Sequence, residues 1–208
     1  MNSQKVVEIL HAVSKKIEEE KDFLTELDNV IGDGDHGINM ARGFQKVEEK
    51  LDTLQTTDIG NILKTTGMTL VSTVGGASGP LYGTAFMKAG MVVAGKEELT
   101  LDDFLACMDA AAEGVKMRGK STQGEKTMLD SMIPALEAMK KAKEEGQDTP
   151  AVLQKGTEAA KEGVEYTKTI IATKGRASYV GERSIGHQDP GATSFTDILE
   201  TICNCVSA

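Results

Sequence analysis

Apolar residues recur at helical spacing along most of this 208-residue chain, and this periodicity constrains the fold more than any other feature. Near the N-terminus, Val6, Leu10, Val13 and Ile17 form the i, i+4, i+7, i+11 stripe of an amphipathic helix. No run of alternating apolar and polar residues predicts a strand. The β-branched segment 71–74 is short and continues a helical stripe. The sequence therefore predicts an all-α protein.

Capping and breaking residues divide this pattern into eight expected helices. Ser3 opens the first, Thr100 with Asp103 resembles a capping box, and Thr149 followed by Pro150 opens another. The expected helices span about 3–31, 35–51, 57–74, 80–94, 100–118, 127–145, 149–171 and 192–206, with a weak point near Asp22 and a bend at Pro134.

Four of the connections between these helices are rich in glycine and polar residues. They are the first (residues 28–37), the third (75–79), the fifth (119–126) and the seventh (174–191), whereas the other three are short plain turns. Each alone reads as a surface turn. If consecutive helices alternate in direction, as short turns favour, all four lie at one end of the bundle. We therefore expect an antiparallel up-and-down bundle of eight helices with a site at one end.

The first connection contains three aspartates and three glycines within ten residues. In an unbroken helix, Asp28 and Asp35 would lie about 10 Å apart along the axis, too far to share one ion. Gly32 and Gly34 allow the helix to end and the chain to fold back, so that both can converge with Asp33. Any one aspartate could instead cap the next helix. The three together favour a site for a hard cation, which we expect to be Mg²⁺.

Two familiar motifs are excluded. Counted from Asp33, an EF-hand would need a glycine where Ile38 stands and a glutamate where Phe44 stands. The segment 114–121 matches the P-loop expression GxxxxGKS. A P-loop follows a strand and opens a helix, whereas this segment ends a helix with Gly119 as its expected C-terminal cap. The segment can still border a nucleotide, because it belongs to the shared end.

The third and seventh connections point to phosphate. Residues 75–79 precede a helix, whose first N–H groups favour an anion. Residues 172–191 are long for a connection in a compact domain, and such loops are functional lids or disordered. On this expected lid, Arg176 could offset phosphate charge, although Arg176 and Arg183 would equally suit a solvated surface. His36, beside the aspartates, could contact phosphate or form a hydrogen bond at a helix end.

Composition narrows the class of protein. The net charge of −9 argues against binding to nucleic acid or to anionic membrane surfaces, and the lack of Trp argues against base stacking. No apolar run reaches the length of a membrane span, and no signal peptide opens the chain. Cys107, Cys203 and Cys205 read as buried thiols in a reducing compartment. We expect one cytoplasmic domain spanning residues 1–208.

Three segments are specific enough to indicate a family, namely IGDGDHGINMARGF, TGMTLVSTVGGASGPLYGT and KGRASYVGERSIGHQDPGATS. Together they resemble the ADP-binding L subunits of phosphotransferase-system (PEP)-dependent dihydroxyacetone kinases, over Leu27 to Ser194. The resemblance implies a barrel closed by eight antiparallel helices. It implies that Mg-ADP stays bound as a coenzyme and that a histidine-phosphorylated carrier subunit of the sugar phosphotransferase system phosphorylates it to ATP. Dihydroxyacetone, held on a separate K subunit, would then receive the phosphoryl group.

The resemblance also implies roles for single residues. Asp28, Asp33 and Asp35 would bind magnesium, expected to be two ions, and Arg176 would be catalytic. The residues expected to bind ADP or ATP are His36, Gly37, Ile38, Asn39, Ala77, Ser78, Gly119, Thr127, Met128, Arg176, Asp189, Pro190 and Gly191. The sequence shows no nucleophile triad, which agrees with phosphoryl transfer by positioning and charge neutralisation.

Two other functions stay open. The first is a kinase domain of the same fold that consumes free ATP, as in single-chain dihydroxyacetone kinases or fatty-acid kinases. Those chains carry large additional domains, whereas this chain starts at Met1 and ends soon after its last helix. The second is a non-catalytic regulator that uses the bundle as a binding module, against which the three intact aspartates argue. Slow release of ADP would favour the subunit, and rapid turnover of free ATP would favour the kinase domain.

Overall fold

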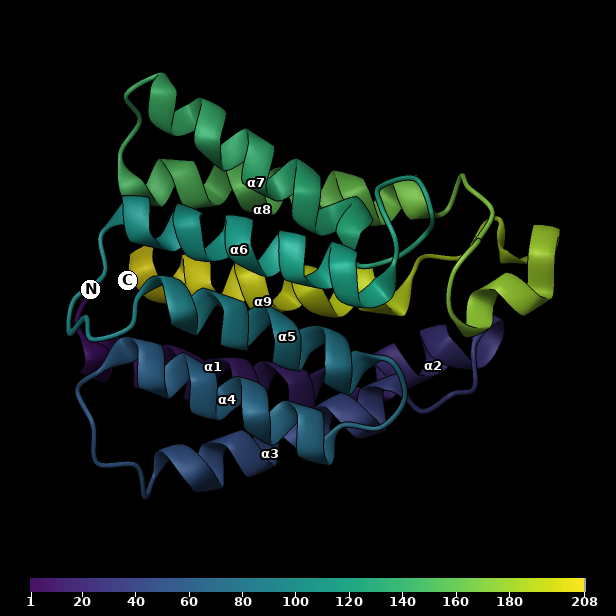
Figure 1. Cartoon of the computed structure of the whole chain (residues 1–208). Coiled ribbons are helices and arrows are strands. Elements are labelled where there is room, and N and C mark those ends of the chain that lie inside the picture. The colour runs from purple at the N-terminus through teal and green to yellow at the C-terminus, as the bar shows by residue number, and fades with distance from the viewer. Residues whose placement is uncertain (208) are drawn as a thin grey trace.

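The computed structural model describes residues 1–207, and these residues are almost entirely helical (Figure 1). The helices are α1 (Ser3–Glu19), α2 (Lys21–Ile31), α3 (His36–Leu51), α4 (Ile59–Thr73), α5 (Ser78–Val92), α6 (Leu101–Gly119), α7 (Leu129–Glu144), α8 (Thr149–Thr167), the 3₁₀ helix η1 (Arg176–Ser184) and α9 (Pro190–Ser207). Over residues 1–207, the β pairing is limited to an isolated bridge between Asn2 and Glu98. The all-α prediction is confirmed.

The helix boundaries follow the capping residues with a few differences. The expected first helix consists of α1 and α2, because Glu20 leaves helical geometry at φ −89° and ψ 1°. The capping box of Thr100 and Asp103 is present at the start of α6. At the other end of α6, the left-handed C-cap is Lys120 (φ 47°) and not Gly119, which is the last helical residue.

The helices follow a circular order. Each of α3 to α9 packs against its neighbour along the chain, and both α3 and α9 pack against α1. This order agrees with the barrel that the sequence led us to expect. Figure 1 shows the helices running back and forth, with both termini at one end. The connections α2–α3, α4–α5, α6–α7 and α8–α9 lie at the opposite end, as the alternation of helices predicted.

Glycines allow α4 and α5 to approach each other closely. A Cβ atom added to Gly67 would lie 2.6 Å from the carbonyl oxygen of Gly83, and one added to Gly83 would lie 2.7 Å from the carbonyl oxygen of Gly67. These distances are shorter than any normal contact of a Cβ atom, so a larger residue would push the two backbones apart. The close packing fixes where the 75–79 connection leaves α4 and enters α5.

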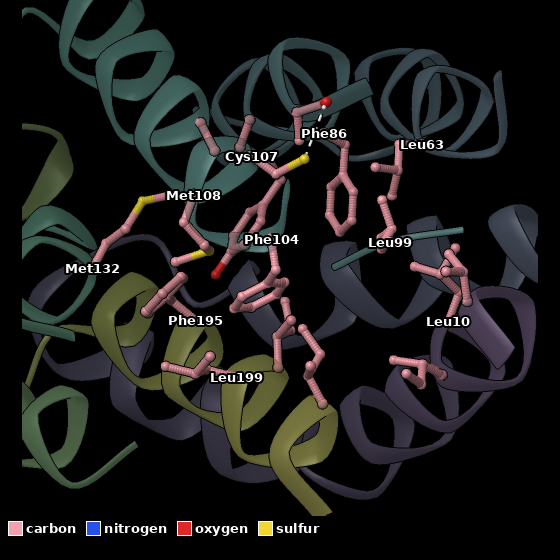
Figure 2. A pocket seen from close by; sticks show the side chains of 18 of the residues that line it. Leu10, Leu63, Phe86, Leu99, Phe104, Cys107, Met108, Met132, Phe195 and Leu199 are labelled. Atoms are coloured by element: carbon pink, nitrogen blue, oxygen red, sulfur yellow. Dashed lines mark hydrogen bonds between the residues drawn. The ribbon is translucent and has the colours of Figure 1, made fainter. Parts of the chain in front are cut away.

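The interior of the bundle is apolar and leaves a small cavity (Figure 2). This cavity has a volume of about 140 Å³, and Leu10, Phe86, Phe104 and Phe195 are among the side chains that point into it. An apolar cavity of this size offers water no hydrogen-bonding partner. Among the described residues, no helix is both long and apolar enough to cross a lipid bilayer.

Candidate functional site

A cleft of about 860 Å³ opens at the end of the bundle where the four unusual connections meet. All four contribute to its walls: the aspartate connection, the 75–79 connection, residues of the 119–128 stretch, and residues 173–179 and 189–191. Its volume lies in the range of small-molecule sites. The alternating helix directions therefore bring together, in one cleft, chain segments as far apart as Asp28 and Gly191.

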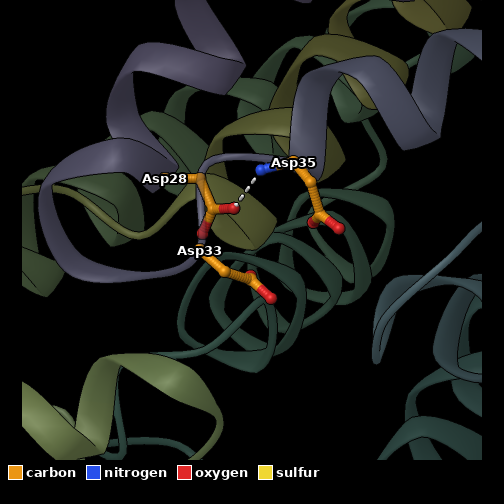
Figure 3. A group of neighbouring side chains, drawn as sticks. All are labelled: Asp28, Asp33 and Asp35. Atoms are coloured by element: carbon orange, nitrogen blue, oxygen red, sulfur yellow. Dashed lines mark hydrogen bonds between the residues drawn. The ribbon is translucent and has the colours of Figure 1, made fainter.

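Figure 3 shows the three aspartates converging in this cleft. Each offers a carboxylate oxygen that lies within 4.8 Å of those of the other two. The Oδ2 atom of Asp28 accepts hydrogen bonds from the backbone N–H groups of Asp35 at 2.9 Å and His36 at 3.1 Å. Gly34, with φ +73°, turns the chain back towards α2. The connection is thus folded around the buried carboxylate of Asp28.

The chemistry of this cluster fits a magnesium ion. Three carboxylates held this close repel one another, and an all-oxygen set of ligands is the kind that Mg²⁺ prefers. A partial charge balance comes from Arg176, whose Nε lies 3.1 Å from Oδ2 of Asp33. One guanidinium offsets one of three negative charges. A divalent cation would offset the remaining two, so the residues suit the ion that the sequence predicted.

Arg176 is the first residue of η1 and lies on the expected lid. It follows Gly175, whose φ of 60° and ψ of −160° suit glycine alone. The Arg176 side chain is 68% exposed, even with its ion pair to Asp33. The lid thus has its own helix and reaches the aspartate cluster through the exposed cation of Arg176.

His36 is buried beneath the cleft and joins three parts of the bundle. Its Nδ1 hydrogen-bonds with the hydroxyl of Ser78 and its Nε2 with the hydroxyl of Ser194, both at 2.9 Å. The Ser194 hydroxyl also lies 2.7 Å from the hydroxyl of Tyr82. Burial lowers the pKa of His36 to about 4, although the charges of Asp28 and Asp35 oppose this shift. The ring is therefore neutral near pH 7, with one nitrogen donating and the other accepting.

The 75–79 connection places the start of α5 at the cleft. Ala77 and Ser78 both line the cleft, and Ser78 is the first residue of α5. The N–H groups of the first turn have no partner within a helix, so this end of α5 attracts an anion. Asn39 supports the connection from behind, because a Cβ atom on Gly75 would lie 3.0 Å from its Nδ2.

Three residues expected to bind the nucleotide do not line the cleft, namely Gly37, Ile38 and Asn39. A Cβ atom on Gly37 would lie 2.0 Å from the carbonyl oxygen of Lys21, so this glycine allows α3 to pack against α2. Ile38 is 51% exposed on the outer side of α3. The Oδ1 atom of Asn39 accepts a hydrogen bond from Arg42 at 2.6 Å. The structure therefore places Gly37 in the packing of α2 and α3, Asn39 behind the 75–79 connection and Ile38 on the surface.

The remaining expected residues do line the cleft, namely Gly119, Thr127, Met128, Asp189, Pro190 and Gly191. The Asp189 carboxylate accepts a hydrogen bond from the N–H of Ala192 at 2.7 Å and so caps α9. Burial raises the pKa of Asp189 to about 7. The wall at the start of α9 is thus held by a buried acid that is close to its titration point at neutral pH.

Several polar residues of the cleft were not expected from the sequence, namely Tyr82, Arg118, Ser121, Lys126, Thr173 and Lys174. Lys126 is the most unusual, because it is 1% exposed and has the left-handed φ of 59°. Its amine donates to backbone carbonyl groups that lie 41 to 61 residues further along the chain. No local pattern could reveal such partners. The amine also explains why α8 ends at Thr167 and not near residue 171, because it binds the carbonyl oxygen of Thr167.

Residues 30–204 match the family described as the DAK2 domain. The chain is 48% identical over 183 residues to the ADP-binding subunit DhaL of the PEP-dependent dihydroxyacetone kinase of Escherichia coli (strain K12), an alignment that covers 88% of this chain and 87% of that protein. It is 40% identical over 201 residues to the ADP-binding subunit DhaL of the PTS-dependent dihydroxyacetone kinase of Lactococcus lactis, which covers 97% and 96% of the two chains.

Solved structures show the same fold. The crystal structure of the dihydroxyacetone kinase of C. freundii in its native form superposes with a TM-score of 0.74 at 24% identity, over 96% of this chain and 34% of that one. The same enzyme in complex with AMP-PNP and Mg²⁺ gives a TM-score of 0.72 at 22% identity, over 96% and 33%. This chain spans about a third of those solved chains. With fold, cleft and relatives in agreement, the chain belongs to the DAK2-domain family.

Proposed function

We propose that this chain is the ADP-binding subunit of a multi-subunit, PEP-dependent dihydroxyacetone kinase. The observation that carries the proposal is the convergence of Asp28, Asp33 and Asp35 within 4.8 Å of one another, in the same cleft as the start of α5. A cation site next to a helix N-terminus suits a diphosphate, because both attract negative charge. Relatives at 40–48% identity over most of their length are named as such subunits.

Each wall of the cleft has a part in holding Mg-ADP. The three aspartates hold magnesium, and we propose two ions. Ala77 and Ser78 present the first N–H groups of α5 to the phosphates, while Gly119, Thr127 and Met128 border the nucleoside. The segment 189–191 lies next to Met128 and completes this wall. When bound, magnesium supplies charge neutralisation and the nucleotide supplies the acceptor for the phosphoryl group.

Arg176 is the proposed catalytic residue. Its guanidinium already lies beside the aspartate cluster, paired with Asp33, and 68% of the side chain is exposed. An exposed arginine can exchange one anionic partner for another without a burial penalty, and its planar donors suit phosphate oxygens. The Ser78–His36 pair of the cleft lacks an orienting carboxylate, because the other ring nitrogen of His36 is held by the hydroxyl of Ser194. This chain therefore acts by orienting and neutralising, and it forms no covalent intermediate of its own.

The proposal requires two partners. A histidine-phosphorylated carrier subunit of the sugar phosphotransferase system supplies the phosphoryl group, and a separate K subunit holds dihydroxyacetone. Names of relatives as PEP-dependent and PTS-dependent kinase subunits support this division of labour. The cleft opens at the end of the bundle, where η1 and the glycine connections are accessible to a second protein.

A kinase domain that consumes free ATP is the second candidate, because the fold recurs in a C. freundii enzyme solved with AMP-PNP and Mg²⁺. Nucleotide exchange separates the two. The purified chain is loaded with magnesium and labelled ADP, and release of label is followed with an excess of unlabelled ADP. Slow release, together with conversion of the bound ADP to ATP by the phosphorylated carrier, supports the subunit. Rapid exchange with multiple turnovers of free ATP would overturn it.

A further inference from the structure

Lys126 lies at the point where the lid leaves the bundle and returns to it. Its amine donates hydrogen bonds to the carbonyl oxygens of Thr167 at 2.5 Å, His187 at 2.5 Å and Ile170 at 3.4 Å. Thr167 is the last residue of α8, and His187 lies three residues before the start of α9. One side chain therefore holds both ends of the segment that carries Arg176.

Lys126 could bind the phosphates of a nucleotide or hold the lid in place, and the geometry decides between these two roles. An ammonium group has three N–H donors, and all three are directed at backbone carbonyl oxygens. No donor is left for a phosphate oxygen, although Lys126 lines the cleft. At 1% exposure, the amine would leave these carbonyl groups without partners if it turned towards a ligand. Lys126 is thus a clamp on the lid, not a ligand of the nucleotide.

Other hydrogen bonds join the two ends of the lid at the same place. The N–H of Gly186 donates to the carbonyl oxygen of Lys168 at 2.7 Å. The N–H of Asp189 donates to Oγ1 of Thr167, and the N–H of Ala172 donates to Oγ of Ser184, both at 3.0 Å. The two ends of the lid therefore form one hydrogen-bonded unit, and Lys126 bonds to both of them.

Lys126 is itself held by the nucleotide wall. Lys126 has a left-handed backbone and lies between Gly124 and Thr127 in the chain. The N–H groups of Gly124 and Thr127 both donate to the carboxylate of the buried Asp130 in α7. Movement of the lid base would therefore disturb the wall that Thr127 and Met128 form. Movement of that wall would likewise disturb the lid base. The clamp therefore joins the lid base to the neighbouring wall of the cleft.

We propose that Lys126 is a positioning residue, which fixes both ends of the lid so that Arg176 stays beside Asp33 at the mouth of the cleft. The effect on phosphoryl transfer rests on the proposed function. The effect on the lid does not, because it follows from hydrogen bonds within this chain.

Hydrogen exchange tests the clamp without any nucleotide. In the full chain, Lys126→Met should raise the exchange rates of the amides of Ala172, Gly186 and Asp189 by about tenfold or more, because bonds to a charged donor are lost. The matched control is Lys155→Met, which removes an exposed lysine of α8 paired with Glu158 and should leave these rates unchanged. Equal rates in Lys126→Met and wild type would overturn the proposal.

A double-mutant cycle with Arg176→Ala tests the link to catalysis. The rate of conversion of bound Mg-ADP to ATP by the phosphorylated carrier is measured for both single variants and the double variant. If Lys126 acts through Arg176, Lys126→Met should slow the wild type at least tenfold and slow Arg176→Ala less than threefold. Losses that multiply would contradict it. Should Lys126→Met fail to fold, Lys126→Gln, which keeps two N–H donors, replaces it in both experiments. Absence of transfer in the wild type would refute the proposed function. The hydrogen-exchange experiment would still test whether Lys126 holds the lid.

Discussion

The Nε2 atom of His36 lies 2.9 Å from the hydroxyl oxygen of Ser194, 158 residues further along the chain. This hydrogen bond connects the first residue of α3, which directly follows the aspartate connection, to α9, which follows the lid. Ser194 in turn contacts Tyr82 of α5. A buried polar network therefore holds three walls of the cleft in register, and a network of this kind stabilises the fold only while every member has a partner.

Removal of the Ser194 hydroxyl should destabilise the protein. Ser194→Ala leaves one nitrogen of a buried imidazole without a partner, so we expect the free energy of unfolding to fall by about 1–3 kcal/mol. Urea denaturation with detection by circular dichroism measures this. Ser207→Ala, an exposed serine on the same helix, serves as the control and should change the value by less than about 0.5 kcal/mol. Equal effects of the two substitutions would show that the network carries no stability.

Loss of a metal ligand should abolish retention of the nucleotide. Asp33→Ala or Asp35→Ala removes a charged ligand of a divalent ion, so we expect neither variant to keep ADP through gel filtration in the presence of magnesium. Asp22→Ala, an exposed aspartate at the start of α2, is the matched control and should retain ADP. A variant of Asp33 or Asp35 that eluted with bound ADP would remove that residue from the metal site.

Arg176 should matter more for transfer than for binding. With Arg176→Ala, we expect a loss of about 10²-fold or more in the rate of phosphoryl transfer, and a much smaller change in the affinity for ADP, because the guanidinium acts on charge that develops during transfer. Arg183→Ala changes an exposed arginine of the same 3₁₀ helix and should leave both quantities near wild type. Equal losses in transfer and binding would assign Arg176 to ground-state binding.

Asp197 should make stability depend on pH. Burial raises the pKa of Asp197 to about 6, from 3.8, and within residues 1–207 its Oδ2 accepts no hydrogen bond. A carboxyl group with a raised pKa favours the fold when protonated. Its contribution is therefore fully present below pH 4 and is lost as the pH rises through 6. Between pH 4 and pH 7, the free energy of unfolding of the wild type should fall by about 1–3 kcal/mol because Asp197 ionises. Asp197→Asn should not show this part of the pH dependence.

Denaturant unfolding of wild type and Asp197→Asn at several pH values checks this difference. Subtracting the two curves cancels the other titrating groups of the fold. Asp22→Asn, on an exposed site, should follow the wild-type curve. A constant offset between wild type and Asp197→Asn across the whole range would mean that Asp197 does not titrate in this window.

The parts of the fold that depend on local pattern could be predicted from the sequence. The helical stripes, the capping box at Thr100 and the gathering of the glycine-rich connections at one end all follow from periodicity and from the alternation of helices. Convergence of the three aspartates follows from the glycines between them, since Gly34 takes the left-handed geometry that such a turn requires.

The parts that depend on distant contacts could not be predicted. Lys126 is a lysine in a polar connection, and only the folded chain brings the carbonyl groups of Thr167 and His187 to its amine. For the same reason the end of α8 was placed about four residues too late. Gly37 belongs to a family motif. In the structure, its lack of a side chain lets α3 pack against the backbone of Lys21. No spacing in the sequence reveals this packing role.

Native mass spectrometry of the purified chain, with magnesium in the buffer, tests the central claim most directly. If Asp28, Asp33 and Asp35 anchor a diphosphate through magnesium, the spectrum should show the mass of the chain plus one ADP plus magnesium, and EDTA should remove both together. A chain that appears without nucleotide after incubation with excess ADP and magnesium would contradict the account.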